Sequence, residues 1–439
     1  MLSQLKQKIE RKEAVIGVIG LGYVGLPVAA VFAQTGFQVI GVDIKAERVN
    51  LINQGVCPIE GEEPGLADLL AEVAGAGKLQ ATTDYQDLSQ ADVILIDVET
   101  PVDDNHQPQY VALKAACRAL GAVLREGALV IVESTIAPGT MDRVVGPLLA
   151  EANGRGINEG FYLGACPERV MPGKLLANLR QMSRVCGGST PEIAELMVAL
   201  YRHIVAADLD VADCVTAELV KTTENAFRDV NIAFANEVAL ICEAVGGDVW
   251  RVRELVNKSP GRNMHFPGAG VGGHCIPKDP WLLAYGAQGQ LDLSLIPAAR
   301  RVNNQMPLHM VDLLQSALET QGIALSQARV AVLGYAYLEN SDDTRNTPSA
   351  VLVERLRAAG AEVRIHDPWV AEYEGDLLDC VRGCDAAVLM VAHTAYKTVD
   401  LIEIGAIMRT PVLIDGRHLF SLSQVNAGNF VYRVIGRGS

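Results

Sequence analysis

The feature that most constrains the fold is the segment Gly20-Leu-Gly-Tyr-Val-Gly25, which directly follows a short β-branched apolar run at residues 15–19. A helical pattern continues to residue 35, and a second apolar run at residues 38–42 ends at Asp43. A strand, a glycine-rich turn, a helix and another strand form a βαβ unit, which belongs to a parallel sheet. The chain is therefore predicted to begin with a dinucleotide-binding α/β domain.

The three glycines have separate roles in such a turn. Gly20 permits the tight bend, Gly22 lets a pyrophosphate approach the backbone, and Gly25 allows close helix–strand packing. The diphosphate then lies at the N-terminus of the helix, where unpaired N–H groups and the helix dipole favour negative charge. Asp43 can accept hydrogen bonds from a ribose diol and would repel a 2′-phosphate, which favours NAD over NADP, although Lys45 and Arg48 lie nearby.

Further strand-like runs predict two sheets. In the first half they lie at residues 93–98 and 129–133, each followed by a polar turn. The C-terminal third repeats the plan, with predicted strands at 329–333, 362–366, 386–391 and 412–414 and a helix at 348–359. The glycine triplet is missing near Gly334, so this second domain is not expected to bind NAD.

Between the two domains, residues 212–243 contain neither Gly nor Pro. A helix of this length is far longer than the average of about 11–12 residues, and it is either a connector or a subunit interface. The predicted fold is α/β, with two Rossmann-like doubly wound domains joined by a long central helix. The predicted boundaries are 1–205 for the NAD-binding domain, 206–315 for a central helical region and 316–439 for the C-terminal domain.

Composition excludes several classes of function. The net charge is −15 and basic runs are absent, which argues against nucleic acid and anionic membranes as partners. No apolar stretch approaches the ~20 residues of a membrane span, and the N-terminus lacks the apolar run of a signal peptide, so we expect a soluble cytoplasmic protein. The nine cysteines are irregularly spaced, which indicates neither a disulfide framework nor a metal site.

One cysteine has distinctive neighbours. Cys275 follows the glycine-rich stretch 267–273, and His274, Lys278 and Asp279 surround it in sequence. A glycine-rich loop lets backbone amides close on a ligand, and a nucleophilic thiolate needs a positive environment. A lone cysteine is more often a small buried apolar residue, and His274 more often structural.

Three polar residues of the long helix share one face. Lys221, Asn225 and Arg228 follow the spacing i, i+4 and i+7. Such a face is commonly the solvated side of a helix, but Lys221 and Asn225 could also stabilise an oxyanion.

Five motifs in order carry a family resemblance. They are Gly20-Leu-Gly-Tyr-Val-Gly-Leu-Pro, Ser134-Thr135-x-x-Pro-Gly-Thr, Cys166-Pro-Glu-Arg, Lys221-x-x-x-Asn225 and Gly272-Gly-His-Cys-x-Pro-Lys-Asp279. Together, over about residues 15–420, they resemble the UDP-glucose/GDP-mannose dehydrogenase family. The resemblance implies oxidation of the C6 alcohol of a nucleotide sugar to a carboxylate, with two NAD reduced. It also implies a homodimer through the central helix, which could associate further.

The resemblance also implies residue roles. Cys275 would form the thiohemiacetal and thioester, Lys221 and Asn225 would stabilise the oxyanion, and Asp279 would assist proton transfer. Glu168 would act in hydrolysis, and Thr135 would lie beside the nicotinamide. The expected cofactor contacts are Gly20, Gly22, Tyr23, Val24, Asp43, Arg48, Thr100 and Thr135. The expected substrate contacts are Glu168, Arg169, Lys221, Asn225, Arg228, Arg262, Gly273, Arg345 and Arg417. Arg262 would reach the substrate of a neighbouring subunit. Arg345 and Arg417 could equally form ion pairs that pack the domains.

The stretch from Cys166 to Gly173 resembles the branch of the family that acts on UDP-N-acetylmannosamine, because Pro172 replaces an acid of the UDP-glucose branch. UDP-N-acetylglucosamine, UDP-glucose and GDP-mannose are the alternatives, and a non-catalytic NAD-responsive protein is a reading of another class. Two positions depart from the family pattern: Glu99 replaces a proline near the NAD site, and Leu338 replaces a lysine that contacts uridine nucleotides.

Overall fold

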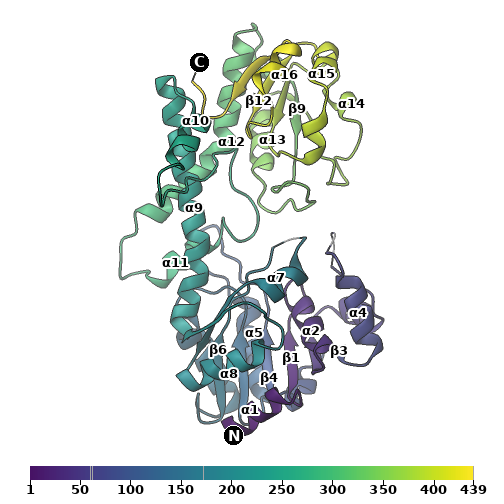
Figure 1. Ribbon diagram of the computed structural model, residues 1–439, viewed down its shortest axis with the longest axis vertical. Helices are drawn as coiled ribbons and strands as arrows, with labels where there is room; N and C mark the ends of the chain where they lie inside the picture. Colours follow the sequence, from purple (N-terminus) through teal and green to yellow (C-terminus); the bar gives the residue numbers. More distant parts are fainter. Residues whose placement is uncertain (60, 62, 172, 439) are drawn as a thin grey trace. The chain divides into compact units, whose positions relative to one another are not determined.

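The computed structural model describes residues 1–59, 61, 63–171 and 173–438 (Figure 1). The chain divides into two compact units. The first comprises Met1–Glu224 and Trp281–Leu291, and the second comprises Asn225–Pro280 and Asp292–Ser439. Each unit contains one sheet covered by helices.

The sheet of the first unit has, within the described residues, the strand order β3-β2-β1-β4-β5-β6-β7-β8. Neighbouring strands are parallel except β6 and β7, which run antiparallel. The strands are β1 (Val15–Ile19), β2 (Gln38–Val42), β3 (Leu79–Thr82), β4 (Val93–Ile96), β5 (Ala128–Val132), β6 (Phe161–Ala165), β7 (Arg184–Gly188) and β8 (Leu209–Asp213). The helices are α1 (Leu2–Glu10), α2 (Gly25–Gln34), α3 (Ala46–Asn53), α4 (Leu66–Gly75), α5 (Val111–Val123), α6 (Gly146–Asn153), α7 (Leu175–Gln181) and α8 (Pro191–Tyr201).

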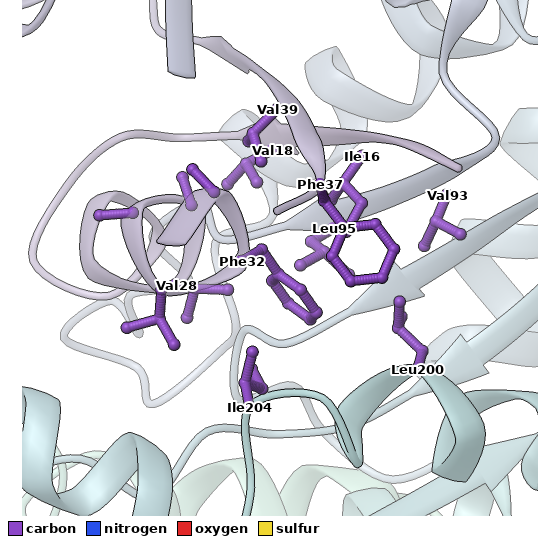
Figure 2. Packing of buried hydrophobic residues seen from close by; sticks show 14 of the residues in the cluster. Ile16, Val18, Val28, Phe32, Phe37, Val39, Val93, Leu95, Leu200 and Ile204 are labelled. Atoms are coloured by element: carbon purple, nitrogen blue, oxygen red, sulfur yellow. The ribbon is translucent and has the colours of Figure 1, made fainter. Parts of the chain in front are cut away.

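Side-chain alternation explains why the inner strands are apolar throughout. In β4, Val93 and Leu95 join the core formed with α2 and α8, whereas Ile94 and Ile96 join the core formed with α5. Successive side chains of a strand point to opposite faces, so a strand covered on both sides must be apolar at every position. Figure 2 shows the first of these cores, where the Phe32 and Phe37 rings lie among side chains of the sheet.

The second unit contains a parallel sheet with the order β10-β9-β11-β12-β13 in the part of the chain that is described. Its strands are β9 (Arg329–Leu333), β10 (Glu362–His366), β11 (Ala386–Leu389), β12 (Val412–Asp415) and β13 (Val431–Val434). Its helices include α10 (Val249–Val256), α12 (Leu295–Glu319), α13 (Pro348–Ala358), α14 (Leu377–Val381), α15 (Leu401–Ile407) and α16 (Leu422–Ala427).

Two helices cross the boundary between the units in sequence. They are α9 (Cys214–Val245), of 32 residues, and α11 (Asp279–Gly286). The structure confirms the predicted α/β class, the two Rossmann-like domains and the long central helix. The helix begins two residues later than residue 212, because β8 continues to Asp213.

Some local predictions were wrong. The strand expected at 93–98 ends at Ile96, and the strand expected at 129–133 covers Ala128–Val132. The 25-residue helix α12 was not anticipated; it contains Pro307, a residue that normally interrupts a helical pattern.

Candidate active site

The first unit forms the predicted dinucleotide turn between β1 and α2. Gly20 has a φ of +92°, and its N–H donates to the carbonyl of Val42 at 2.8 Å. A Cβ at Gly25 would lie 2.0 Å from the carbonyl oxygen of Gly20, whereas a Cβ at Gly22 would meet no atom within 4 Å. The turn is therefore closed by Gly25 and open in front of Gly22, which fits a group that approaches the backbone there.

Asp43 directly follows β2 beside this turn and is 6% exposed. Its Oδ2 accepts hydrogen bonds from the N–H of Leu21 and from Nη1 of Arg48, both at 3.0 Å. Its Oδ1 accepts one from the N–H of Lys45 at 2.9 Å. The predicted residues Asp43 and Arg48 are thus brought together, and the carboxylate is held where a ribose diol could bind.

The remaining expected cofactor residues lie on the neighbouring loops. Oγ1 of Thr100, which is buried, donates to the carbonyl oxygen of Thr135 at 2.6 Å, so these two residues are adjacent. Val24 is half-buried, and the hydroxyl of Tyr23 is hydrogen-bonded to Glu63. Glu99 is exposed beside Thr100.

Glu168 follows β6 and is 7% exposed. Nη2 of Arg184 lies 2.6 Å from its Oε2, and the N–H of Arg169 donates to its Oε1 at 2.7 Å. The side chain of Arg169 instead contacts Glu224 at 2.6 Å and the carbonyl oxygen of Ser183 at 2.7 Å. The guanidinium of Arg169, which was expected to contact the substrate, is therefore bonded to other residues of the protein. Pro172 lies outside the described residues.

The cysteine loop belongs to the second unit. Cys275 is exposed, while six cysteines are buried and two are half-buried. The N–H groups of Lys278 and Asp279 both donate to the carbonyl oxygen of Cys275, at 3.1 and 2.8 Å. This turn places the thiol next to the start of α11.

Asp279 is fully buried one turn after Cys275. Nδ2 of Asn225 donates to its Oδ2 at 2.5 Å, and Nζ of Lys278 lies 3.1 Å from its Oδ1. Lys221 is half-buried one turn before Asn225 on α9. The structure thus joins Asn225 and Asp279 directly and adds Lys278, which sequence reasoning noted beside the thiol without giving it a role.

Gly273 has a φ of +87°, which an L side chain rarely adopts. Its N–H donates to the carbonyl oxygen of Arg345 at 2.9 Å, and its own carbonyl accepts from Asn346 at 3.1 Å. A Cβ at Gly273 would lie 2.7 Å from the ring of Tyr337. The cysteine loop is therefore bonded to the segment between β9 and α13.

Burial, and then Lys278 and Arg345, lower the pKa of His274 to about 4. The imidazole of His274 is therefore uncharged at neutral pH, so it does not supply the positive charge that a thiolate needs. The side chain of Arg345 pairs with Asp343 at 2.5 Å, and Nε of Arg417 donates to the carbonyl oxygen of Met390 at 2.7 Å. Arg228 and Arg262 are exposed, as is Leu338.

Family models match the chain in three consecutive parts. The NAD binding domain of the UDP-glucose/GDP-mannose dehydrogenase family matches residues 14–205, its central domain matches 215–305, and its UDP binding domain matches 331–421. The fold and these sites define an NAD-dependent α/β oxidoreductase. The chain belongs to the UDP-glucose/GDP-mannose dehydrogenase family of nucleotide-sugar dehydrogenases.

Individual relatives are similar over almost the whole chain. A UDP-N-acetyl-D-mannosamine dehydrogenase from Pyrococcus horikoshii is 43% identical over 96% of this chain and 99% of its own length. A solved structure titled as that enzyme from the same organism has a TM-score of 0.91, with 42% identity, and covers 97% of this chain and 99% of its own. The structure of an NDP-N-acetyl-D-galactosaminuronic acid dehydrogenase from Methanosarcina mazei has a TM-score of 0.88, with 37% identity, covering 99% and 98%.

Within the described residues, no helix is long and apolar enough to cross a membrane. The described part of the chain also lacks any cluster of His, Cys, Asp and Glu that could hold a metal ion.

Proposed function

We propose that the protein oxidises UDP-N-acetyl-D-mannosamine to UDP-N-acetyl-D-mannosaminuronate. The observation that carries this proposal is the 43% identity to the Pyrococcus horikoshii enzyme over 96% of the chain. The names of both reported relatives contain an N-acetylated sugar, which favours a 2-acetamido sugar over glucose or mannose. A galactose-configured 2-acetamido sugar is the second candidate, because of the similarity to the Methanosarcina mazei structure.

The cofactor fits the first unit. Gly20, Gly22 and Asp43 would hold the diphosphate and ribose of NAD, with Tyr23, Val24, Arg48, Thr100 and Thr135 around them. The open space at Gly22 supports this assignment. When bound, NAD accepts hydride from the C6 carbon in each of two oxidations.

The residues of the chain divide the work around that carbon. The thiolate of Cys275 would add to the C6 aldehyde, forming a C–S bond and leaving a thiohemiacetal. Lys221 and Asn225 would stabilise the oxyanion. Loss of the second hydride leaves a thioester, which water hydrolyses to the carboxylate with release of the thiol.

Proton movement would be handled by carboxylates. Asp279 is held by Asn225 and Lys278, so its position relative to the Cys275 turn is fixed. Glu168, held by Arg184, would orient the hydrolytic water. Burial of both carboxylates excludes competing bulk water from their surroundings.

Substrate contacts are proposed for Gly273, Arg228, Arg345, Arg417 and Arg169, and for Arg262 reaching the site of a second subunit. Arg228 is exposed on α9, where a phosphate or sugar hydroxyl could reach it. If Arg228→Ala leaves the KM for the UDP-sugar unchanged, this assignment is wrong. The same division of roles assigns 1–205 to NAD binding, 206–315 to the central region and 316–439 to the UDP-sugar.

We also propose a homodimer through α9, in a cytoplasmic enzyme. Phe227, Phe234 and Ile241 recur every seven residues on this helix and are 70%, 55% and 54% exposed. An exposed apolar stripe of this kind supports association with a second copy. Sedimentation of Phe234→Glu against the parent chain tests this assignment, since a charge on the stripe should yield monomers.

The substrate is tested by following NADH formation at 340 nm with UDP-N-acetylmannosamine, UDP-N-acetylglucosamine, UDP-N-acetylgalactosamine and UDP-glucose in parallel. We expect turnover with the first sugar. Turnover of another sugar alone would overturn the substrate assignment and keep the family chemistry. Absence of NADH with every sugar would leave a non-catalytic NAD-binding protein as the better reading.

A further inference from the structure

Three acids stand in a row at the carboxyl edge of the first sheet. Asp97 directly follows β4, Glu133 directly follows β5, and Glu168 comes shortly after β6. The register pairs Ile96 with Val132, so Asp97 and Glu133 are side by side. The N–H of Glu133 donates to the carbonyl of Ile96 at 3.0 Å, and the N–H of Glu168 donates to the carbonyl of Glu133 at 3.1 Å. Parallel sheets place ligands at this edge.

Within the described part of the chain, one buried cation contacts these acids. Arg184, at the start of β7, is 1% exposed; its Nη1 lies 3.1 Å from Oε1 of Glu133 and its Nη2 lies 2.6 Å from Oε2 of Glu168. The hydroxyl of Tyr201, on α8, donates to Oε1 of Glu133 at 2.6 Å. The buried thiols of Cys166 and Cys186 also lie near these groups. Three ionised carboxylates would therefore leave two negative charges uncompensated in a buried site, which is costly.

The surroundings of Asp97 indicate which carboxyl group carries a proton and so removes part of this negative charge. Both of its carboxylate oxygens are buried and, among the described residues, receive no N–H or O–H donor; the same holds for Oε2 of Glu133. Asp97 and Glu133 directly follow the paired residues Ile96 and Val132, so these buried oxygens without a donor belong to neighbouring side chains. Two ionised carboxylates have only acceptor atoms, so neither can satisfy the other unless one of them carries a proton.

We propose that Asp97 and Glu133 share one proton, and that this pair is a positioning element that leaves Arg184 available to hold Glu168 in a fixed orientation. If the shared proton were lost, two adjacent negative charges would compete with Glu168 for Arg184. Burial, and then Glu133, raise the pKa of Asp97 well above its usual range. Burial raises the pKa of Glu133 to about 7, although Arg184 opposes this shift.

Asp97 also lies against the dinucleotide turn. A Cβ at Gly20 would lie 2.6 Å from the carbonyl oxygen of Asp97, and one at Gly25 would lie 2.9 Å from Cβ of Asp97. A protonated carboxyl at Asp97 adds no negative charge next to the turn that would hold a diphosphate. The role given to Glu168 rests on the proposed function, whereas the shared proton does not.

The shared proton is tested directly by infrared spectroscopy of the protein without substrate at about pH 8, where ordinary Asp and Glu side chains are ionised. We expect a carboxylic acid C=O band that disappears in Asp97→Asn and persists in the control Asp104→Asn, which alters an exposed acid of the following loop. Absence of the band, or its persistence in Asp97→Asn, would overturn the proposal.

The positioning role is tested by the pH profile of UDP-sugar oxidation. If the shared proton matters, kcat of the parent should fall at alkaline pH. Asn at position 97 can donate permanently to Glu133, so Asp97→Asn should keep kcat at pH 7 and lose this fall. Asp97→Val removes the donor and should lower kcat at pH 7 by about tenfold, with KM nearly unchanged. Parent-like profiles in both variants would refute the positioning role. If the parent oxidises no UDP-sugar, the proposed function fails, while the infrared result still decides the shared proton.

Discussion

Replacing Arg300 by Met would remove the positive charge from a buried ion pair between α12 and α9. Nη1 of Arg300 lies 2.6 Å from Oδ1 of Asp229, and the two side chains are 3% and 0% exposed. Nδ2 of Asn303 also donates to Oδ1 at 2.8 Å, whereas Oδ2 of Asp229 has no hydrogen-bond partner in the described structure. Met retains most of the volume of Arg, so the change mainly removes the charge.

The loss of unfolding free energy depends on how the buried Asp229 carboxylate responds once Arg300 is gone. Removing one partner of a buried pair costs about 3–5 kcal/mol. Asp229 can limit this cost by binding a proton, which from the ordinary pKa of 3.8 costs about 4 kcal/mol at pH 7 and about 2 kcal/mol at pH 5.5. Burial already raises the pKa of Asp229 in the intact pair, so these values are upper limits.

The sign of the pH dependence is set by the direction of the shift. In Arg300→Met the pKa of Asp229 in the folded state lies further above its unfolded value. Stability is therefore fully present below the unfolded pKa and is lost as the pH rises toward the folded pKa. We expect the variant to lose about 3–4 kcal/mol of unfolding free energy at pH 7 and about 2 kcal/mol at pH 5.5.

Urea denaturation followed by tryptophan fluorescence, to which Trp250 and Trp369 of the same unit contribute, measures both values. Arg301→Met is the matched control, because Arg301 is exposed on the same helix and its loss should change stability by less than about 0.5 kcal/mol. Equal destabilisation of Arg300→Met at the two pH values, or no more than that of the control, would refute the reasoning.

Two further predictions concern the first unit. Gly22→Ala should keep the Tm of the parent, because a Cβ there meets no atom within 4 Å, but it should bind NAD at least about tenfold more weakly. Gly25→Ala should lower the Tm, because its Cβ would lie 2.0 Å from a carbonyl oxygen. NAD titration and thermal unfolding separate the two effects, and unchanged NAD affinity in Gly22→Ala would contradict the assignment. Burial raises the pKa of Glu218 from 4.5 to about 7. Up to about 3 kcal/mol of stability that is present below pH 4.5 should therefore be lost as the pH rises to 7. Glu218→Gln should make the Tm depend less on pH between pH 4.5 and 7 in thermal unfolding.

The sequence predicted the elements whose pattern is local. The glycine triplet between two β-branched runs identified the βαβ unit, and a long stretch without Gly or Pro identified α9. Helix α12 was missed because Pro307 resembles a break; the chain continues through it as a helix packed by Met306, Met310 and Leu314.

The candidate site was predictable where residues are close in sequence and obscure where only the fold joins them. The turn from Cys275 to Asp279 could be seen in the sequence, but the contact of Asn225 with Asp279 spans 54 residues. Arg184 stands in an ordinary strand sequence, and nothing local shows that it is buried between Glu133 and Glu168. Glu133 carried one usable signal, its place at a strand end directly before Ser134-Thr135.

The central claim is a four-electron oxidation that passes through a thioester on Cys275. It is tested most directly by counting NADH formed per molecule of UDP-N-acetylmannosamine consumed, in the parent chain and in Cys275→Ser. The account predicts two NADH per sugar in the parent and loss of the second oxidation in the variant, because a serine hydroxyl cannot replace the thiolate. One NADH per sugar in the parent, or two at an unchanged rate in Cys275→Ser, would contradict it.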